Sequence, residues 1–414
     1  MTANSLSEMW TTLVPALGNH LWQSTLCMGI VGLLTLMLRK NHARTRYWLW
    51  LAASLKFLIP FSLLVNVGNH LAWTRIPAGT DARLYAAMNE ISQPFTHSKA
   101  PINSGILLSP ASPSVAHVLS ATLAGAWVCG FILVLSSWYL RWRKVSTTIC
   151  QAVPLREGRE VEALRRMERV GAMRGRIEIL LSSASLAPGV FGIVHPVLLW
   201  PEGISRHLED AHLEAIVAHE VWHVRRRDNL AAALHMLIEA VFWFHPLVWW
   251  LGVRLVEERE RACDEEVLQL GSERQVYAES ILKTCEFCVG FPLVCISGVT
   301  GADLKKRIVR IMTPREAYRL NFSKKLLLAL AALAAVVGPM MLGSLKATAT
   351  RVEAQAETLA GTTRLAKLLQ ASLVKPDETA TVTIPKAGPR RTKLCAKTLA
   401  ARKAAAKSGT GKIN

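Results

Sequence analysis

The chain has 414 residues, 51% of them hydrophobic, and a formal net charge of +19. Its mean hydropathy of +0.26 is too high for an ordinary soluble protein and indicates several membrane spans. Lys and Arg that flank spans, together with a basic tail, explain the charge better than nucleic-acid binding, so no direct nucleic-acid partner is expected. No cleavable signal peptide is expected either, because residues 1–16 lack a basic start.

Four segments have the length and apolarity of a transmembrane helix, which needs about 20 mostly apolar residues. They are 17–38, 47–67, 114–140 and 326–345. The predicted fold class is therefore a multi-pass α-helical membrane protein with four transmembrane helices.

Clusters of Lys and Arg orient these spans. They lie at 39–46, 141–144 and 324–325, which all fall on one side of the membrane. Because basic residues concentrate in cytoplasmic loops, this side is predicted to be cytoplasmic.

The same orientation divides the chain into regions. Residues 1–140 form an N-terminal membrane region with an external loop at 68–113, and 141–325 form a domain on the cytoplasmic side. The tail at 346–414, which follows the fourth span, is predicted to lie outside and to be disordered, because it is basic and rich in Ala, Lys and Thr.

The strongest chemical signal is H-E-V-W-H at 219–223. Residues four apart share one face of a helix, so His219 and His223 can bind one ion. Zinc suits two imidazoles, one further ligand and a water in the open position. Glu220 is the candidate general base that takes the proton of this water.

A third ligand is predicted on a second helix, in the sequence LVEERERACDEEVL. Glu260 would complete a His-His-Glu set, and Asp264, one turn later, would hold a ligand imidazole from behind. Glu257, Glu258 and Glu265 are competing acids for these roles.

The apolar segment 230–255 is long enough to be a further span. As a straight helix it would separate its ends by roughly 30 Å and place His223 and Glu260 on opposite sides of the membrane. The segment contains His245-Pro246, and proline breaks a helix interior. A helix, a turn and a returning helix are therefore predicted.

Two further expectations concern the substrate. Residues 187–204 contain two short β-prone runs, which are predicted to form either a strand that pairs with an extended substrate or an ordinary core hairpin. His235 and His245 are candidates for stabilising the transition-state oxyanion, only because they lie near the motif in sequence.

Five stretches of this sequence resemble the BlaR/MecR-type membrane metallopeptidases. The stretches are HEVWHVRRRDN, PGVFGIVHPVLLWP, ERACDEEVL, NHLWQSTL and RYWLWLAASLKFLIP. The resemblance covers about 1–325 and implies a gluzincin-like, mostly α (α+β) zinc peptidase domain between the third and fourth spans. It implies that His219, His223 and Glu260 are ligands, that Glu220 is the base, and that Asp264 is the acid of an ExxxD motif. Arg227 and Asp228 fall on the family's RRD run, for which a structural role is expected.

The chain departs from the best-known members of that family, which sense β-lactams through a large penicillin-binding domain after the fourth span. Only about 70 residues follow that span in this sequence. The S-x-x-K at 372–375 and the K-S-G at 407–409 lie in a segment too short and too polar to form the acyl-transfer fold. Acylation by a β-lactam is therefore not expected.

The sequence predicts a zinc endopeptidase of a bacterial inner membrane that acts in signalling or regulated proteolysis. Its expected partners are the lipid bilayer and a protein substrate, with a transcriptional repressor or the chain itself as candidates. A homodimer is one option for the oligomeric state. Three alternatives stay open: a transducer with a non-catalytic zinc site, a membrane quality-control peptidase, and a basic binder that acts through 346–414.

Overall fold

The computed structural model describes residues 3–71, 90, 93–95, 113–173, 175–183, 187–289, 301–313 and 318–373. The chain forms two compact units, Met1–Ala349 and Thr350–Asn414. Helix α12 (Phe322–Leu373) continues past the predicted end of the fourth span into the second unit. Its Ala- and Leu-rich sequence favours a helix there, in place of the expected disorder over 346–373. The rest of the predicted tail lies outside the described residues.

Three helices of the described chain are long and apolar enough to cross a membrane. Their apolar stretches are Leu13–Met37 in α1 (Ala3–Met37), Val118–Gln151 in α5 (Pro113–Gln151), and Phe322–Met341 in α12. The α5 and α12 stretches are only 6% buried within the structure, as expected for helices whose apolar side chains face lipid.

The predicted span at 47–67 is not one straight helix. It forms α2 (Ala43–Lys56) and α3 (Phe61–Leu71), which are bent by 78° at the break between them. Pro60 lies at this break, where its missing N–H and its ring disfavour helix continuation. A fourth span is therefore present only if this bent pair acts as one.

A four-stranded sheet follows α5, in the order β1-β2-β4-β3. Its strands are β1 (Val153–Leu155), β2 (Glu178–Ser182), β3 (Gly189–Phe191) and β4 (Val197–Pro201). Strands β2 and β4 are parallel, and the other two pairs are antiparallel. Strands β3 and β4 form a hairpin, one of the two alternatives predicted for 187–204. Since β3 stands last in the strand order, it is an edge strand of the described sheet.

The hairpin turn requires glycine at one position. Gly192 has a φ of +90°, and a Cβ on it would lie 2.3 Å from the carbonyl oxygen of His195. Only glycine tolerates this combination of left-handed backbone and close approach.

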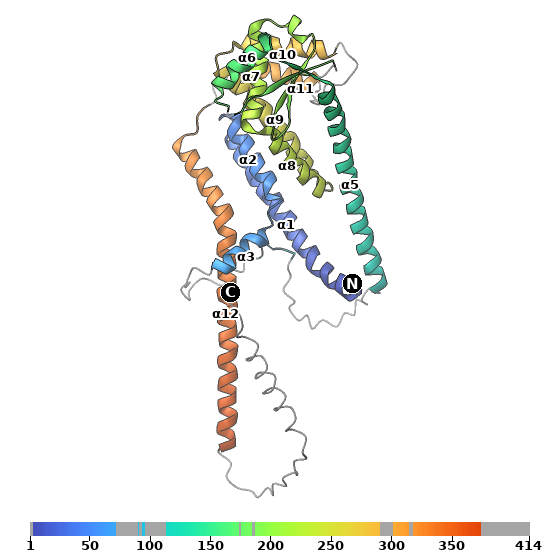
Figure 1. Ribbon diagram of the computed structural model, residues 1–414. Coiled ribbons are helices and arrows are strands. Elements are labelled where there is room, and N and C mark those ends of the chain that lie inside the picture. Colours follow the sequence, from blue (N-terminus) through green and yellow to red (C-terminus); the bar gives the residue numbers. More distant parts are fainter. Residues whose placement is uncertain are drawn as a thin grey trace, which may run out of the picture. The chain divides into compact units, whose positions relative to one another are not determined.

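Helices cover the sheet and carry the candidate site. Helices α6 (Arg159–Val170) and α7 (Asp210–Arg226) pack through a core that includes Leu164, Trp200 and Val217, all fully buried. After α7 come α8 (Asp228–Val241), α9 (Pro246–Gln269), α10 (Arg274–Val289) and α11 (Gly301–Met312). Figure 1 shows α6, α7, α10 and α11 gathered with the sheet at one end of α5.

The apolar segment 230–255 is divided between α8 and α9 and does not form one helix. Helix α9 begins at Pro246, where a proline needs no hydrogen-bonded N–H. Ile238 of α8 and Leu251 of α9 are fully buried in one cluster with Tyr47 and Trp50 of α2. With this packing α9 runs back alongside α7. A metal site that takes ligands from both helices requires them to lie this close.

Buried charges fasten α9 to the start of α2. Arg46 Nε donates to Glu258 Oε2 at 2.9 Å, and Arg261 Nη1 donates to Glu258 Oε1 at 2.6 Å. Glu265 Oε2 accepts the backbone N–H of Ala43, the first residue of α2, at 2.9 Å. Glu258 and Glu265 therefore have structural partners away from the histidines.

The substitution Glu258→Ala is expected to lower the free energy of unfolding by about 3–5 kcal/mol, because it leaves the buried Arg46 guanidinium without its counter-charge. The matched control is Glu257→Ala on the same helix. Glu257 is 40% exposed where it pairs with Arg254, so its loss should lower that free energy by at most about 1 kcal/mol. Unfolding of both variants in detergent checks the difference, and equal effects would contradict it.

Candidate metal centre

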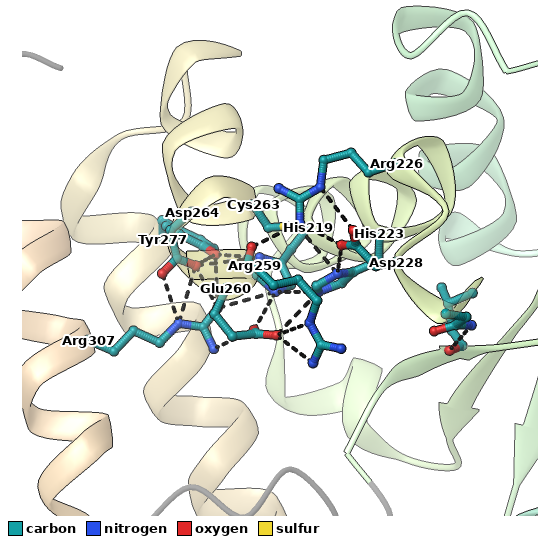
Figure 2. A network of polar contacts seen from close by, with 12 residues as sticks. His219, His223, Arg226, Asp228, Arg259, Glu260, Cys263, Asp264, Tyr277 and Arg307 are labelled. Carbon is teal, nitrogen blue, oxygen red and sulfur yellow. Dashed lines mark hydrogen bonds and ion pairs between the residues drawn. The ribbon is translucent and has the colours of Figure 1, made fainter. Parts of the chain in front are cut away.

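The structure brings together the three residues predicted as zinc ligands. His219 and His223 lie one turn apart on α7, and their Nε2 atoms are 3.2 Å apart. Glu260 approaches from α9, with Oε2 3.3 Å from His219 Nε2 and Oε1 3.8 Å from His223 Nε2 (Figure 2). Two imidazoles and one carboxylate thus converge on a single point.

The outer nitrogen of His223 is held by Asp228. A sharp turn at Arg227, which has a φ of +57°, ends α7 and places Asp228 at the first position of α8. Asp228 Oδ2 lies 2.7 Å from His223 Nδ1. Burial acts to raise the pKa of Asp228, but hydrogen bonds from His223 and Arg226 outweigh it and lower that pKa. The ionised carboxylate accepts the proton of Nδ1. Burial acts to lower the pKa of His223, but Cys263, the hydrogen bond with Asp228 and the charge of Glu260 raise that pKa well above its ordinary value. A metal ion at Nε2 would take the place of the proton on that nitrogen.

The outer nitrogen of His219 is held in a similar way through a tyrosine. Tyr277 of α10 donates its hydroxyl proton to Asp264 Oδ1 at 2.7 Å, so its oxygen is free to accept from His219 Nδ1 at 2.9 Å. Burial and the neighbouring Asp264 raise the pKa of Tyr277 well above its ordinary value, so the hydroxyl keeps its proton. The other ring nitrogen of His219, Nε2, faces the Glu260 carboxylate. Asp264 is placed behind His219, with Tyr277 between them.

These contacts test whether the residues fit a metal ion. The two Nε2 atoms and the Glu260 carboxylate face one another at 3.2 and 3.3 Å, an arrangement that needs a proton or a metal cation between them. Ligand atoms about 2.0–2.1 Å from a tetrahedral zinc ion lie roughly 3.3 Å apart. The two separations agree with that value, and the 3.8 Å between His223 Nε2 and Glu260 Oε1 is somewhat longer. The three side chains therefore have the donor atoms and the spacing to hold a metal ion.

Cys263 provides a rival third ligand. Its sulfur, with His219 and His223, forms a group whose ligand atoms all lie within 4.8 Å of one another. However, the sulfur is 3.5 Å from His223 Nδ1, the nitrogen that Asp228 already occupies. Burial also raises the pKa of the Cys263 thiol, which opposes the thiolate form that binds metals. The geometry therefore favours Glu260 over Cys263.

Arginines surround the Glu260 carboxylate. Arg259 Nη2 donates to Glu260 Oε1 at 3.1 Å, and Arg307 of α11 places Nη1 3.7 Å from Oε2. Burial acts to raise the pKa of Glu260, but the hydrogen bond with His219 and the charges of His223 and Arg259 lower it far below its ordinary value. Arg307 Nη2 also donates to Asp264 Oδ1 at 2.6 Å and lies 3.3 Å from His219 Nε2. Glu260 is therefore held as an anion, and Arg307 contacts both Glu260 and Asp264.

Among the described residues, Glu220, His235 and His245 make no hydrogen bond or ion pair with this cluster. Glu220 is half-buried on α7 and has no hydrogen-bond or ion-pair partner among the described residues. His235 Nδ1 contacts Ser54 of α2 at 2.8 Å, and His245 Nε2 contacts Thr25 of α1 at 3.3 Å. The two oxyanion candidates thus contact the apolar helices instead of joining the cluster around Glu260.

The role of the Tyr277 hydroxyl, which lies between His219 and Asp264, can be tested by removing it. Tyr277→Phe is expected to lower zinc affinity by about 10–100-fold, because His219 loses the partner that fixes its tautomer and ring orientation. Zinc competition against a chelator of known affinity measures the change. Tyr139→Phe removes a hydroxyl from a side chain that is 56% exposed on α5 and serves as the control. Equal affinities of Tyr277→Phe and wild type would show that the link does not support the metal.

The family described as BlaR1 peptidase M56 matches residues 16–311, most of the chain. This chain belongs to the BlaR1 peptidase M56 family. The matched region runs from α1 to α11 and includes both histidines, Glu260 and Arg307. Membership of the M56 metallopeptidases implies a metal, in agreement with the converging side chains.

Individual relatives match a shorter part of the chain. Regulatory protein BlaR1 of Bacillus licheniformis is 34% identical over 110 residues, which are 26% of this chain and 18% of that protein. Methicillin resistance mecR1 protein of Staphylococcus aureus is 31% identical over 109 residues, which are 26% of this chain and 19% of that protein. Each alignment thus spans less than a fifth of the relative.

One solved structure that matches this chain is the crystal structure of S. mikatae Ste24p. The alignment covers 64% of this chain and 85% of that chain, with 11% sequence identity and a TM-score of 0.28. This similarity is too low to carry an argument about the M56 chain.

Proposed function

We propose that this chain is a membrane-embedded zinc metalloendopeptidase that acts in transmembrane signalling or regulated proteolysis. The observation that carries the proposal is the convergence of His219 Nε2, His223 Nε2 and the Glu260 carboxylate, with both Nδ1 atoms hydrogen-bonded from behind. Its substrate is a protein, and a transcriptional repressor or the chain itself are the candidates. Membership of the M56 family supports the reaction class.

His219, His223 and Glu260 would hold the zinc ion, which when bound supplies a water of lowered pKa and polarises the substrate carbonyl. Asp228 and Tyr277 hold the Nδ1 atoms of the two imidazoles and fix the orientation of both rings. Glu220 accepts the proton of the attacking water and returns it to the leaving amine. Its carboxylate is suited to this role because no described residue neutralises it.

The edge strand β3 is the proposed binding place for an extended substrate. Asn229, next to Asp228, donates to the carbonyl oxygens of Val190 at 3.1 Å and Gly192 at 3.0 Å. This contact ties β3 to the start of α8, close to the metal helix. A peptide that adds to the edge would gain main-chain hydrogen bonds and lie beside a strand that contacts α7, the helix that carries Glu220.

We place the protein in a bacterial inner membrane, with the peptidase domain on the cytoplasmic side and the N-terminus and tail outside. The apolar stretches of α1, α5 and α12 support the membrane location. The basic clusters at the ends of these helices support the orientation.

Metal removal tests the reaction class. The purified full chain, incubated with an unfolded protein substrate, is expected to generate new N-termini in that substrate or in itself. Cleavage should stop when a chelator removes the metal and return when zinc is restored. Mass spectrometry of the products measures this, and cleavage that persists unchanged in chelator would overturn the proposed zinc mechanism.

A further inference from the structure

A cavity of about 1820 Å³ lies beside the metal centre, between the α1–α2 turn, α9 and the end of α11. Small-molecule sites are usually about 300–1,000 Å³, so this cavity has room for a larger ligand. Asp264 lines its wall, but His219, His223 and Glu260 do not. The cavity is therefore a neighbour of the proposed peptidase site and not part of it.

Helix α9 lines this cavity with one face of the helix, which is not the face that carries Glu260. Arg254, Glu258, Arg261 and Glu265 follow one another at spacings of three or four residues, so they share a face. Glu260 belongs to a different face. One helix thus serves the metal centre with one face and the cavity with another.

The cavity has a large excess of positive charge. Eight Lys and Arg side chains line it, against three carboxylates. Each carboxylate is already occupied: Glu258 binds two arginines, Asp264 binds Arg307, and Glu265 binds the start of α2. The excess cations are therefore not neutralised by the carboxylates of the cavity wall.

Five of these cations form no ion pair with any described residue. They are Arg39, Lys40, Arg274, Arg310 and Arg319. Arg261 and Arg310 both line the cavity, so positive charges lie near one another on this wall. An anionic group would relieve this crowding through charge-assisted hydrogen bonds.

The opposite side of the cavity is apolar. Leu33 and Leu36 of α1 line it and are 65% and 66% exposed. A Cβ on Gly29 would meet no atom within 4 Å, so the α1 surface is open at that position. These residues lie within the apolar stretch Leu13–Met37, and Arg39 and Lys40 follow directly after it. The cavity therefore passes from an apolar helix surface to a basic wall where the candidate span ends.

Two tryptophans mark the apolar boundary. Trp50 and Trp250 line the cavity and meet edge to face at 5.2 Å, and the Arg254 guanidinium lies 5.1 Å from the Trp250 ring centre. Indole rings concentrate at the interface between lipid chains and headgroups. Trp250 is 40% exposed and suits a cavity open to that interface, whereas Trp50 is buried behind it.

We infer that this cavity binds an anionic phospholipid, with the headgroup phosphate on the unpaired arginines and an acyl chain along the exposed face of α1. Soluble phosphate would use only the basic wall, whereas a phospholipid matches both the basic and the apolar parts. Basic pockets beside transmembrane helices recognise anionic headgroups by this chemistry. Arg307 and Arg310 are one turn apart on α11, so a bound headgroup would also steady the helix that reaches the metal centre.

Lipid binding to the full-length chain in detergent tests this inference. Native mass spectrometry would compare phosphatidylglycerol with phosphatidylcholine of the same acyl chains. The wild type is expected to bind phosphatidylglycerol at least tenfold more tightly. The triple variant Arg39→Gln, Arg310→Gln, Arg319→Gln is expected to lose that preference.

A control variant that loses the same number of charges distinguishes the effect of the cavity arginines from the effect of the overall positive charge of the protein. Arg156→Gln, Arg169→Gln, Arg206→Gln removes three exposed charges outside the cavity and should keep the preference. A third variant with lysine at residues 39, 310 and 319 keeps the charge and should retain most of the binding. If the glutamine variant does not fold, the lysine variant and the wild-type measurements still decide the question.

Three results would overturn the inference. The first is equal wild-type affinity for the two lipids. The second is an equal loss of preference in the cavity and control variants. The third is full displacement of phosphatidylglycerol by an equal concentration of sodium phosphate, which would show that the cavity is a phosphate site without a contribution from the acyl chain.

Discussion

Replacement of Glu220 by glutamine is expected to slow peptide-bond cleavage by about 10²–10⁴-fold, the range that a general base contributes. Glutamine keeps the size of the side chain but cannot accept a proton from water. Glu220 is not one of the three converging ligands, so the variant should still bind one zinc ion per chain. Product formation by mass spectrometry, together with zinc content, measures both properties in one preparation.

The control for this variant is Glu209→Gln. Glu209 is exposed at the start of α7, and its side chain makes no capping hydrogen bond. Its replacement changes the charge near the same helix but should leave cleavage within about twofold. If Glu220→Gln cleaves as fast as Glu209→Gln, Glu220 is not the base, and the mechanism needs another acceptor.

Replacement of Asp228 by alanine is expected to lower both the stability of the fold and the affinity for zinc. Asp228 is 1% exposed and binds both His223 and Arg226, whose side chain is 5% exposed. Without the carboxylate, the Arg226 charge stays buried and uncompensated, which typically lowers the free energy of unfolding by about 3–5 kcal/mol. The released His223 ring should also lower zinc affinity by about 10–100-fold.

Unfolding in detergent and zinc competition measure these two effects separately. Asp210→Ala is the control, because Asp210 pairs with Arg159 while its side chain is 82% exposed. Its loss should change the free energy of unfolding by at most about 1 kcal/mol. An Asp228→Ala variant as stable as Asp210→Ala would refute the buried ion-pair account.

The ligand candidates could be predicted because they depend on short spacings. His219 and His223 are four residues apart on one helix, as are Glu260 and Asp264 on another. The requirement that both helices reach one ion also predicted the turn before Pro246. The positions of these residues on their helices follow from local periodicity in the sequence. For these residues, the tertiary structure adds only that the two helices approach each other.

The residues that support the ligands could not be predicted in the same way. Tyr277 and Arg307 come from α10 and α11, 13 and 43 residues after Asp264, and no spacing relates them to the histidines. Asp228 was visible within the RRD run, but the turn at Arg227 that aims it at His223 is a backbone detail. The bend at Pro60 was missed because a hydropathy window averages over a single proline.

The central claim is a zinc site made of His219, His223 and Glu260, and zinc content of the purified full chain tests it most directly. The wild type, His219→Ala, Glu260→Ala, Cys263→Ala and the control Glu257→Ala would be measured together. The structure predicts about one zinc per chain in the wild type, in Cys263→Ala and in Glu257→Ala, and none in the other two. Zinc that survives Glu260→Ala but is lost in Cys263→Ala would contradict the claim and assign the third ligand to the thiol.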